Sequence, residues 1–108
     1  MNKTFQINAI GQVKLIKDKS VIELDSNYLS GLTQIEGFSH LQIIWWAHLS
    51  DGLQNRETLI AEKLFKKTPD KIGIFGTRAP ARPNPIMIST IKVEKIDVEK
   101  GIIHTPFI

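Results

Sequence analysis

Residues 73–86 constrain this chain more than any other stretch of its sequence. This Gly/Pro segment reads Gly-Ile-Phe-Gly-Thr-Arg-Ala-Pro-Ala-Arg-Pro-Asn-Pro-Ile, and it holds three of the five prolines and two of the seven glycines. Proline fixes φ and pushes the preceding residue toward extended backbone, whereas glycine lets backbone approach a ligand closely. Arg78 and Arg82 lie within it, and guanidiniums bind carboxylates and phosphates by paired hydrogen bonds. The segment therefore predicts either an anion-binding loop or a rigid connection with two solvated arginines.

The composition is that of a globular chain. Its 108 residues are enough for one domain with a modest core, and 42% of them are hydrophobic and 23% charged. No apolar run approaches the about 20 residues that span a membrane, and no apolar signal core follows the N-terminus. The absence of cysteine excludes disulfides, thiolate metal sites and a thiol nucleophile. We therefore predict a cytoplasmic protein without a membrane partner.

Positive charge gathers beside and within the Gly/Pro segment. Residues 63–82 carry a net charge of +5, which leaves −2 for the rest of a chain whose net charge is +3. A basic surface of this kind is typical of proteins that bind polyanions, and the alternative is a lysine face that serves solubility alone. Lys66 and Lys67 are the lysines that we expect to contact RNA.

The hydropathy pattern predicts many short strands and few helices. Residues 4–10 alternate apolar and polar side chains, residues 13–24 form a hairpin pattern with its turn at 17–20, and residues 86–96 resemble one long strand. Residues 25–32 fit a short helix, and residues 56–65 do not distinguish helix from strand. These patterns predict an all-β, mainly antiparallel fold, specifically a small β-barrel with one or two short helices.

The strongest strand pattern covers residues 39–49. Its two faces differ, because one is entirely apolar and the other is mixed, as suits a pocket or interface. The apolar face, expected to meet the core, consists of Leu41, Ile43, Trp45, Ala47 and Leu49. The mixed face consists of His40, Gln42, Ile44, Trp46 and His48.

The sequence lacks the usual side-chain machinery for hydrolysis. The three histidines have no close metal-ligand spacing, so we predict no metal site, and neither a nucleophile elbow nor a Walker loop is present. A bound small molecule that carries its own reactivity fits the chain better than a side-chain nucleophile.

The Gly/Pro segment resembles the signature G-[VI]-F-[AG]-T-R-[SA]-P-x-R-P-N-P-I of the TrmO family, also known as YaeB/TsaA-like or VirR-like proteins. Residues 37–41, Gly-Phe-Ser-His-Leu, and the pair Ile10-Gly11 fit the same family. The resemblance implies a single TrmO-like β-barrel domain over residues 1–108, which lacks the usual C-terminal strand and pairs into homodimers with the site near the dimer interface. It also implies S-adenosylmethionine-dependent methylation of N6 of a modified adenosine next to the tRNA anticodon.

The resemblance further implies which residues bind the cofactor, S-adenosylmethionine. Arg78 matches the arginine that contacts the methyl donor, and His48 and Leu49 match a pair that also touches it. Ile88 falls where a hydrophobic residue lines the same pocket. His48 is in addition our tentative proton acceptor, and the catalytic residues are otherwise not assigned.

The remaining roles concern the RNA and the donor's adenine. Arg82 and Asn84 match motif positions that shape the site or meet the tRNA. Trp46 or Phe75 would pack against the adenine. Two alternatives stay open: a non-catalytic module of the same fold that binds S-adenosylmethionine or RNA, and a basic RNA-binding barrel without a cofactor.

Overall fold

The fold is built mainly from short antiparallel strands, in a computed structural model that describes residues 3–62 and 70–108. The chain divides into two units, which are described separately. The first unit comprises Met1–Gln42 and Thr90–Ile108, and the second comprises Ile43–Ser89.

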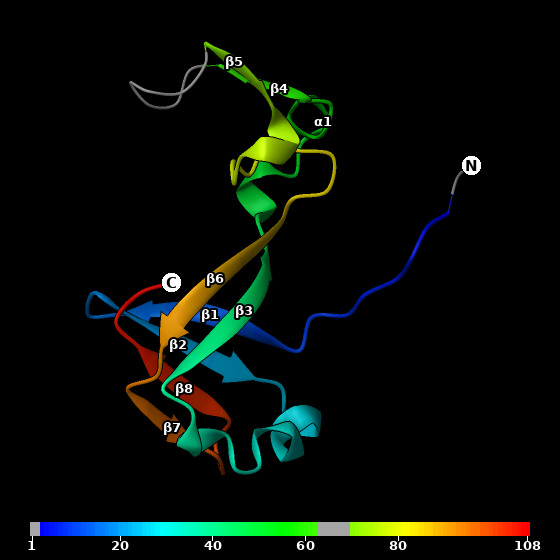
Figure 1. The fold of residues 1–108 in the computed structure, drawn as a ribbon. Coiled ribbons are helices and arrows are strands. Elements are labelled where there is room, and N and C mark those ends of the chain that lie inside the picture. Colours follow the sequence, from blue (N-terminus) through cyan, green and yellow to red (C-terminus); the bar gives the residue numbers. More distant parts are fainter. Residues whose placement is uncertain (1–2, 63–69) are drawn as a thin grey trace. The chain divides into compact units, whose positions relative to one another are not determined.

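A four-stranded antiparallel sheet forms most of the first unit (Figure 1). Its order is β1-β2-β8-β7, with β1 at Gly11–Ile16, β2 at Lys19–Leu24, β7 at Lys95–Asp97 and β8 at Ile102–Thr105. The β1–β2 hairpin turns through Lys17 and Asp18, whose φ angles of 48° and 66° suit the right-handed twist of a two-residue hairpin loop. The hairpin prediction is confirmed.

The core of the first unit follows the register of this sheet. Val13 pairs with Ile22, and Ile22 and Ile96 both pair with Ile103, so one row of aliphatic side chains crosses all four strands. Ile22 and Ile103 in the middle of the row are buried, whereas Val13 on the edge strand is 44% exposed. Burial of the inner side chains is what fixes this register, since a slip by one residue would turn them outward.

The turn before β8 requires a glycine. Gly101 has a φ of 71°, and a Cβ there would collide with the side chain of Leu29. Its carbonyl accepts a hydrogen bond from the amide of Leu24, and its amide donates to the carbonyl of Asp97. The turn thus joins the end of β7 to the end of β2.

The other elements are short. β3 at His40–Trp46 pairs with β6 at Ile86–Lys92, and β4 at Ile60–Glu62 pairs with β5 at Lys71–Gly73. One α-helical turn, α1, covers Leu53–Arg56. The 3-10 turns are η1 at Ser26–Leu32, η2 at Ile35–Gly37, η3 at His48–Ser50 and η4 at Ile74–Gly76.

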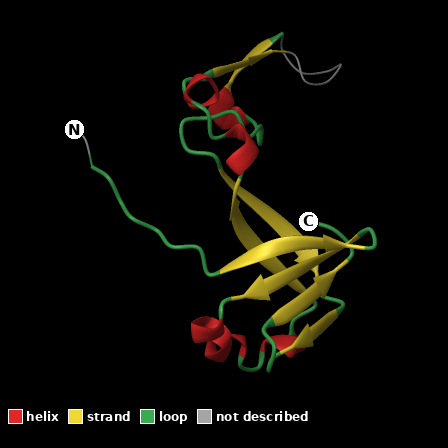
Figure 2. Cartoon of the chain, turned by 180° about the vertical axis from the view of Figure 1, so that it is seen from behind, coloured by secondary structure: helices red, strands yellow, loops and turns green. Residues whose placement is uncertain are grey.

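The all-β, mainly antiparallel prediction is confirmed, but the closed barrel is not. The strands in the described ranges form one four-stranded and two two-stranded sheets, and β1 and β7 are open edges of the largest. A barrel requires such edges to pair with each other. The predicted strand at residues 4–10 is wrong: the segment is extended but outside the sheet, with Phe5 83% exposed (Figure 2).

The predicted long strand at 86–96 is two strands, because the chain changes partner between them. The amide of Val93 donates to the carbonyl of Ser39, and the next amide, that of Glu94, donates to the carbonyl of His104. No helix in the described part of the chain is long and apolar enough to cross a membrane.

Candidate functional site

The predicted site residues that the structure describes all fall within the second unit, Ile43–Ser89. Lys66 and Lys67 lie outside the described residues. The others are His48, Leu49, Arg78, Arg82, Asn84 and Ile88.

The Gly/Pro segment starts from a buried anchor. Ile74 is 1% exposed, and its amide donates to the carbonyl of Leu59, which attaches η4 to the chain before β4. The hydroxyl of Thr77 donates to the carbonyl of Ile74 at 2.8 Å and accepts from the amide of Ala79 at 3.2 Å. A single threonine therefore closes the turn that leads from η4 to Arg78.

Arg82 binds the backbone of its own loop. Its Nε donates to the carbonyl of Ala79 at 2.9 Å, and its Nη2 donates to the carbonyls of Ile74 at 3.0 Å and Thr77 at 2.6 Å. The side chain is half-buried. The guanidinium that was expected to meet RNA or shape the site thus has three of its donor contacts inside the segment, and it shapes the loop.

Arg78 has the opposite environment. It is exposed, and its guanidinium makes no hydrogen bond or ion pair with any described residue. It sits one residue after the Thr77 turn and four before the Arg82 guanidinium that spans this turn. The fold therefore presents one guanidinium, Arg78, on a backbone that a second guanidinium holds in place.

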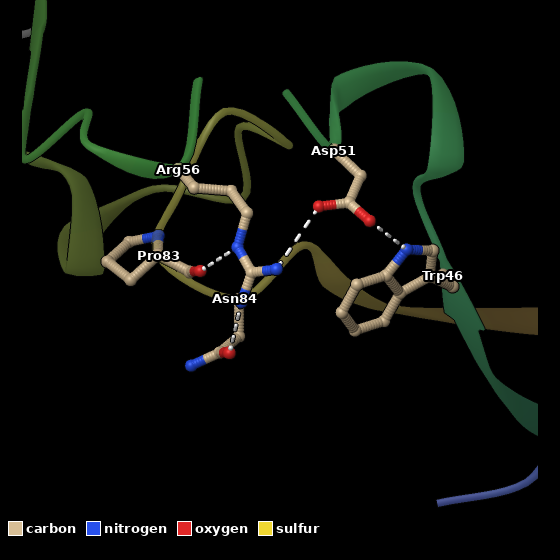
Figure 3. Close-up of polar contacts among 5 residues, drawn as sticks. All are labelled: Trp46, Asp51, Arg56, Pro83 and Asn84. Atoms are coloured by element: carbon tan, nitrogen blue, oxygen red, sulfur yellow. Dashed lines mark hydrogen bonds and ion pairs between the residues drawn. The ribbon is translucent and has the colours of Figure 1, made fainter. Parts of the chain in front are cut away.

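Arg56 makes a second fork, between the end of α1 and the end of the Gly/Pro segment (Figure 3). Its Nε donates to the carbonyl of Pro83 at 2.8 Å, and its Nη2 donates to Oδ1 of Asn84 at 3.1 Å. Its Nη1 donates to Oδ1 of Asp51 at 3.3 Å in an ion pair. All three nitrogens of the guanidinium are engaged, so its plane is fixed.

Asp51 connects this fork to the end of β3. Its Oδ2 accepts a hydrogen bond from Nε1 of Trp46 at 3.1 Å, while its Oδ1 faces Arg56. The guanidinium carbon of Arg56 lies 5.9 Å from the centroid of the Trp46 ring, within the range of a cation–π contact. Trp46, Asp51, Arg56, Pro83 and Asn84 form what we call the Arg56 network.

The remaining predicted site positions are exposed residues of β6 and of η3, the turn that follows β3. His48 and Leu49 lie in η3, and Leu49 is 88% exposed because β3 ends at Trp46 before the predicted strand would. Ile88 on β6 is 43% exposed and Ile44 on β3 is 71% exposed. The mixed face of the predicted strand is exposed, and the expectation that Leu49 lies in the core is wrong.

Sequence reasoning did not identify Arg56 or Asp51 as members of the site. In the sequence, Asp51 stands before Gly52, a pair that is typical of turns, and Arg56 begins residues 56–65, whose pattern does not distinguish helix from strand. One feature of the sequence could have identified Arg56 as a site residue. It is the one arginine outside the Gly/Pro segment, in a chain where lysine is far commoner. Of the predicted residues, the network includes Asn84, and no hydrogen bond joins the described side chains of His48 or Arg78 to it.

The described residues contain no group of three or more histidine, aspartate or glutamate side chains placed to hold a metal ion.

The chain is similar to known proteins along most of its length. Residues 6–106 match the family model of the tRNA-methyltransferase O N-terminal domain. The chain is 33% identical over 86 residues to a probable S-adenosyl-L-methionine-binding protein of Methanothermobacter thermautotrophicus, which covers 80% of this chain and 58% of that protein. It is 50% identical over 32 residues to a tRNA (adenine(37)-N6)-methyltransferase of Eikenella corrodens, covering 30% of this chain and 18% of that protein.

The fold has solved counterparts. The crystal structure of TrmO from Pseudomonas aeruginosa superimposes with a TM-score of 0.64 and 19% sequence identity, covering 95% of this chain and 48% of that one. This chain thus spans about half the length of the solved structure and somewhat more than half of the archaeal relative.

Proposed function

This chain belongs to the TrmO family, and on that premise we propose that it is an S-adenosylmethionine-dependent methyltransferase that acts on N6 of a modified adenosine next to the tRNA anticodon. The observation that carries the proposal is the pair of arginines in the Gly/Pro segment. Arg82 holds the loop, and Arg78 extends from it with no partner among the described residues. An exposed guanidinium that extends from a fixed backbone, with no partner among the described residues, is suited to a carboxylate, which it can bind through two hydrogen bonds.

The residues of the second unit fit such a methyl donor. We assign its carboxylate to Arg78, and its apolar and aromatic surface to Leu49, Ile88 and the end of β3. Leu49 and Ile88 are exposed aliphatic side chains, which would lose contact with water when a ligand covers them. When bound, the donor supplies a methyl group on a positively charged sulfur, which is an electrophile.

The chain's own contribution to methyl transfer is positioning. An in-line displacement gains mostly from holding the two reactants in the correct geometry, and this accounts for a site without a nucleophile–base pair. His48 is exposed and its ring has no hydrogen-bond partner among the described residues. In this proposal it accepts the proton that leaves the amine.

The acceptor in this proposal is tRNA. Asn84 is exposed and fixed through Oδ1 by Arg56, so it can meet the RNA with its amide nitrogen. Lys66 and Lys67 would contact phosphates, as expected for a basic stretch. Arg82 is proposed to act on RNA indirectly, since Nε and Nη2 are engaged by its own loop.

We also propose that the protein is a homodimer with the site near the interface. Ile44 and Ile86 support this, since aliphatic side chains that are 71% and 44% exposed on neighbouring strands are suited to being covered by a second copy. The single-domain organisation and a cytoplasmic location remain predictions of the same proposal.

Calorimetric titration with S-adenosylmethionine tests the donor site. We expect wild-type protein to bind with a micromolar dissociation constant and Arg78→Ala to bind at least about tenfold more weakly, from loss of a charged hydrogen-bonding pair. Lys71→Ala is the matched control, because it removes an exposed cation from the same unit and should leave the affinity unchanged. Equal affinities of Arg78→Ala and wild type would contradict the assignment.

A methylation assay with tRNA distinguishes the enzyme from the non-catalytic alternative. The exposed His48 ring, which no described residue orients, favours that alternative, since general bases are usually held by a second group. Transfer of the methyl group to tRNA supports the enzyme. Tight binding of the donor without transfer would support a module that only senses S-adenosylmethionine.

A further inference from the structure

The indole of Trp46 is exposed and yet held in one orientation. It is 38% exposed at the end of β3. Its Nε1 donates to Asp51 at 3.1 Å, and the guanidinium of Arg56 stands 5.9 Å from the ring centroid. Figure 3 shows that the carboxylate lies between the indole nitrogen and the guanidinium. Rotation of the ring would therefore break a hydrogen bond and displace the cation.

The groups that hold the ring are themselves immobilised. Asp51 uses one carboxylate oxygen for Trp46 and the other for Arg56, and Arg56 is additionally bound to Pro83 and Asn84. An exposed ion pair by itself stabilises a protein little. Three engaged nitrogens on one guanidinium and a shared carboxylate instead give a surface aromatic ring a defined position, as a binding site for a planar group requires.

The surroundings of the ring suit a flat heterocycle. Ile86 is on β6, the strand that pairs with β3, and it is 44% exposed. Asn84 accepts from Arg56 through Oδ1, and its Nδ2, which points away from the network, has no hydrogen-bond partner among the described residues (Figure 3). An exposed aromatic ring held in one orientation is the feature on which proteins stack a nucleobase.

We propose that Trp46 is a stacking platform for an adenine ring, and that Asp51 and Arg56 are positioning residues that hold its indole. The inference rests on the proposed function, in which both the methyl donor and the RNA acceptor carry an adenine. The platform serves one of these two adenines. The residues around Trp46 specify a flat ring and not the molecule that carries it. The experiment below therefore separates the adenine of the methyl donor from that of the RNA.

The test uses the full chain with Trp45→Phe as a background, which leaves Trp46 as the sole tryptophan. Trp45 donates from Nε1 to Ser89 and is half-buried, so it is outside the platform. Quenching of Trp46 emission is recorded with three probes: adenosine, S-adenosylmethionine and an anticodon stem-loop RNA. Calorimetry with the same probes gives affinities for Trp46→Leu and Trp46→Phe.

We expect Trp46→Leu to weaken binding of one adenine-containing ligand by about five- to a hundredfold, the range for loss of one base–aromatic stack. Trp46→Phe should retain most of the affinity, because a smaller aromatic face remains, and it also controls for folding. Loss confined to S-adenosylmethionine assigns the platform to the donor, and loss confined to the RNA assigns it to the acceptor. Undiminished binding of both ligands by Trp46→Leu overturns the inference.

The positioning role is tested with Arg56→Lys, which keeps the cation but not the fork. We expect a shifted Trp46 emission maximum and an affinity reduced a few-fold, while a purely structural role would lower thermal stability without changing quenching by the probe. If the wild-type protein transfers no methyl group to tRNA but binds adenosine in a manner that depends on Trp46, the proposed function is overturned and the stacking role of Trp46 is supported. Normal transfer by Trp46→Leu with unchanged affinities would do the reverse.

Discussion

In the four-stranded sheet, backbone groups hold each strand to the next, whereas in the Gly/Pro segment arginine side chains hold the backbone. The sheet has a continuous register from β1 through β2 and β8 to β7. The Gly/Pro segment has no such ladder after η4, and its carbonyls at Ile74, Thr77 and Ala79 accept from Arg82. Pro80, Pro83 and Pro85 have no amide hydrogen to donate, so side chains must replace the missing ladder.

The comparison shows where each region is sensitive to substitution. In the sheet, the exposed side chains can change while the ladder and the buried row persist. In the Gly/Pro segment, the conformation depends on a few side chains, among them the Arg82 guanidinium that binds three carbonyls. We therefore expect substitutions to rank by burial in the sheet and by hydrogen-bonding role in the segment.

The largest effect is expected from Ile103→Ala in the sheet. Ile103 is 3% exposed in the middle of the aliphatic row, and removing its outer atoms should lower the free energy of unfolding by about 2–5 kcal/mol through lost burial and a cavity. Urea denaturation followed by circular dichroism measures this. Val13→Ala is the matched control, because Val13 is 44% exposed in the same row and should cost far less.

Arg82→Ala should have the next largest effect. It removes a charged donor group from three carbonyls, and we expect a loss of about 1.5–3 kcal/mol in the free energy of unfolding. Amide hydrogen exchange of Ala79, whose N–H donates to Thr77, should speed up in the variant. Arg82→Lys should fail to restore the loop, because an ammonium cannot reproduce the planar fork. Full restoration by lysine would show that charge alone suffices.

The smallest effect is expected from Lys14→Ala on the sheet. Lys14 and Glu23 form an ion pair at 2.9 Å with side chains that are 50% and 48% exposed. Such exposed ion pairs contribute about 0–1 kcal/mol to the free energy of unfolding. Lys14→Ala should therefore barely shift the denaturation midpoint, and high salt, which screens the pair, should make the shift smaller still. A loss as large as that of Arg82→Ala would remove the contrast between the two regions.

Local hydropathy patterns predicted the β1–β2 hairpin correctly, but they predicted a strand in the preceding segment that does not form. Residues 13–24 alternate around a polar turn, and both strands and the turn form as expected because each strand's partner follows directly in the sequence. Residues 4–10 alternate equally well but do not form a strand in the described structure. Alternation specifies which side chains share a face, and it does not specify that a partner strand is within reach.

The site was predicted in its residue types more than in their roles. The rigidity of the Gly/Pro segment and the value of its guanidiniums followed from proline, glycine and arginine chemistry. Which arginine turns inward could not be predicted, because Arg78 and Arg82 have the same chemistry and only the folded loop brings carbonyls within reach of Arg82. Arg56 was missed because its partners, Asp51 and Pro83 with Asn84, are on both sides of it at very different separations in sequence.

Every carbonyl that Arg82 binds lies within the eight residues that precede it. These three hydrogen bonds are thus encoded in one short, contiguous run of codons. A duplication that copied residues 74–82 would carry Arg82 together with all three of its carbonyl partners, whereas the Leu59 carbonyl that anchors Ile74 would stay behind.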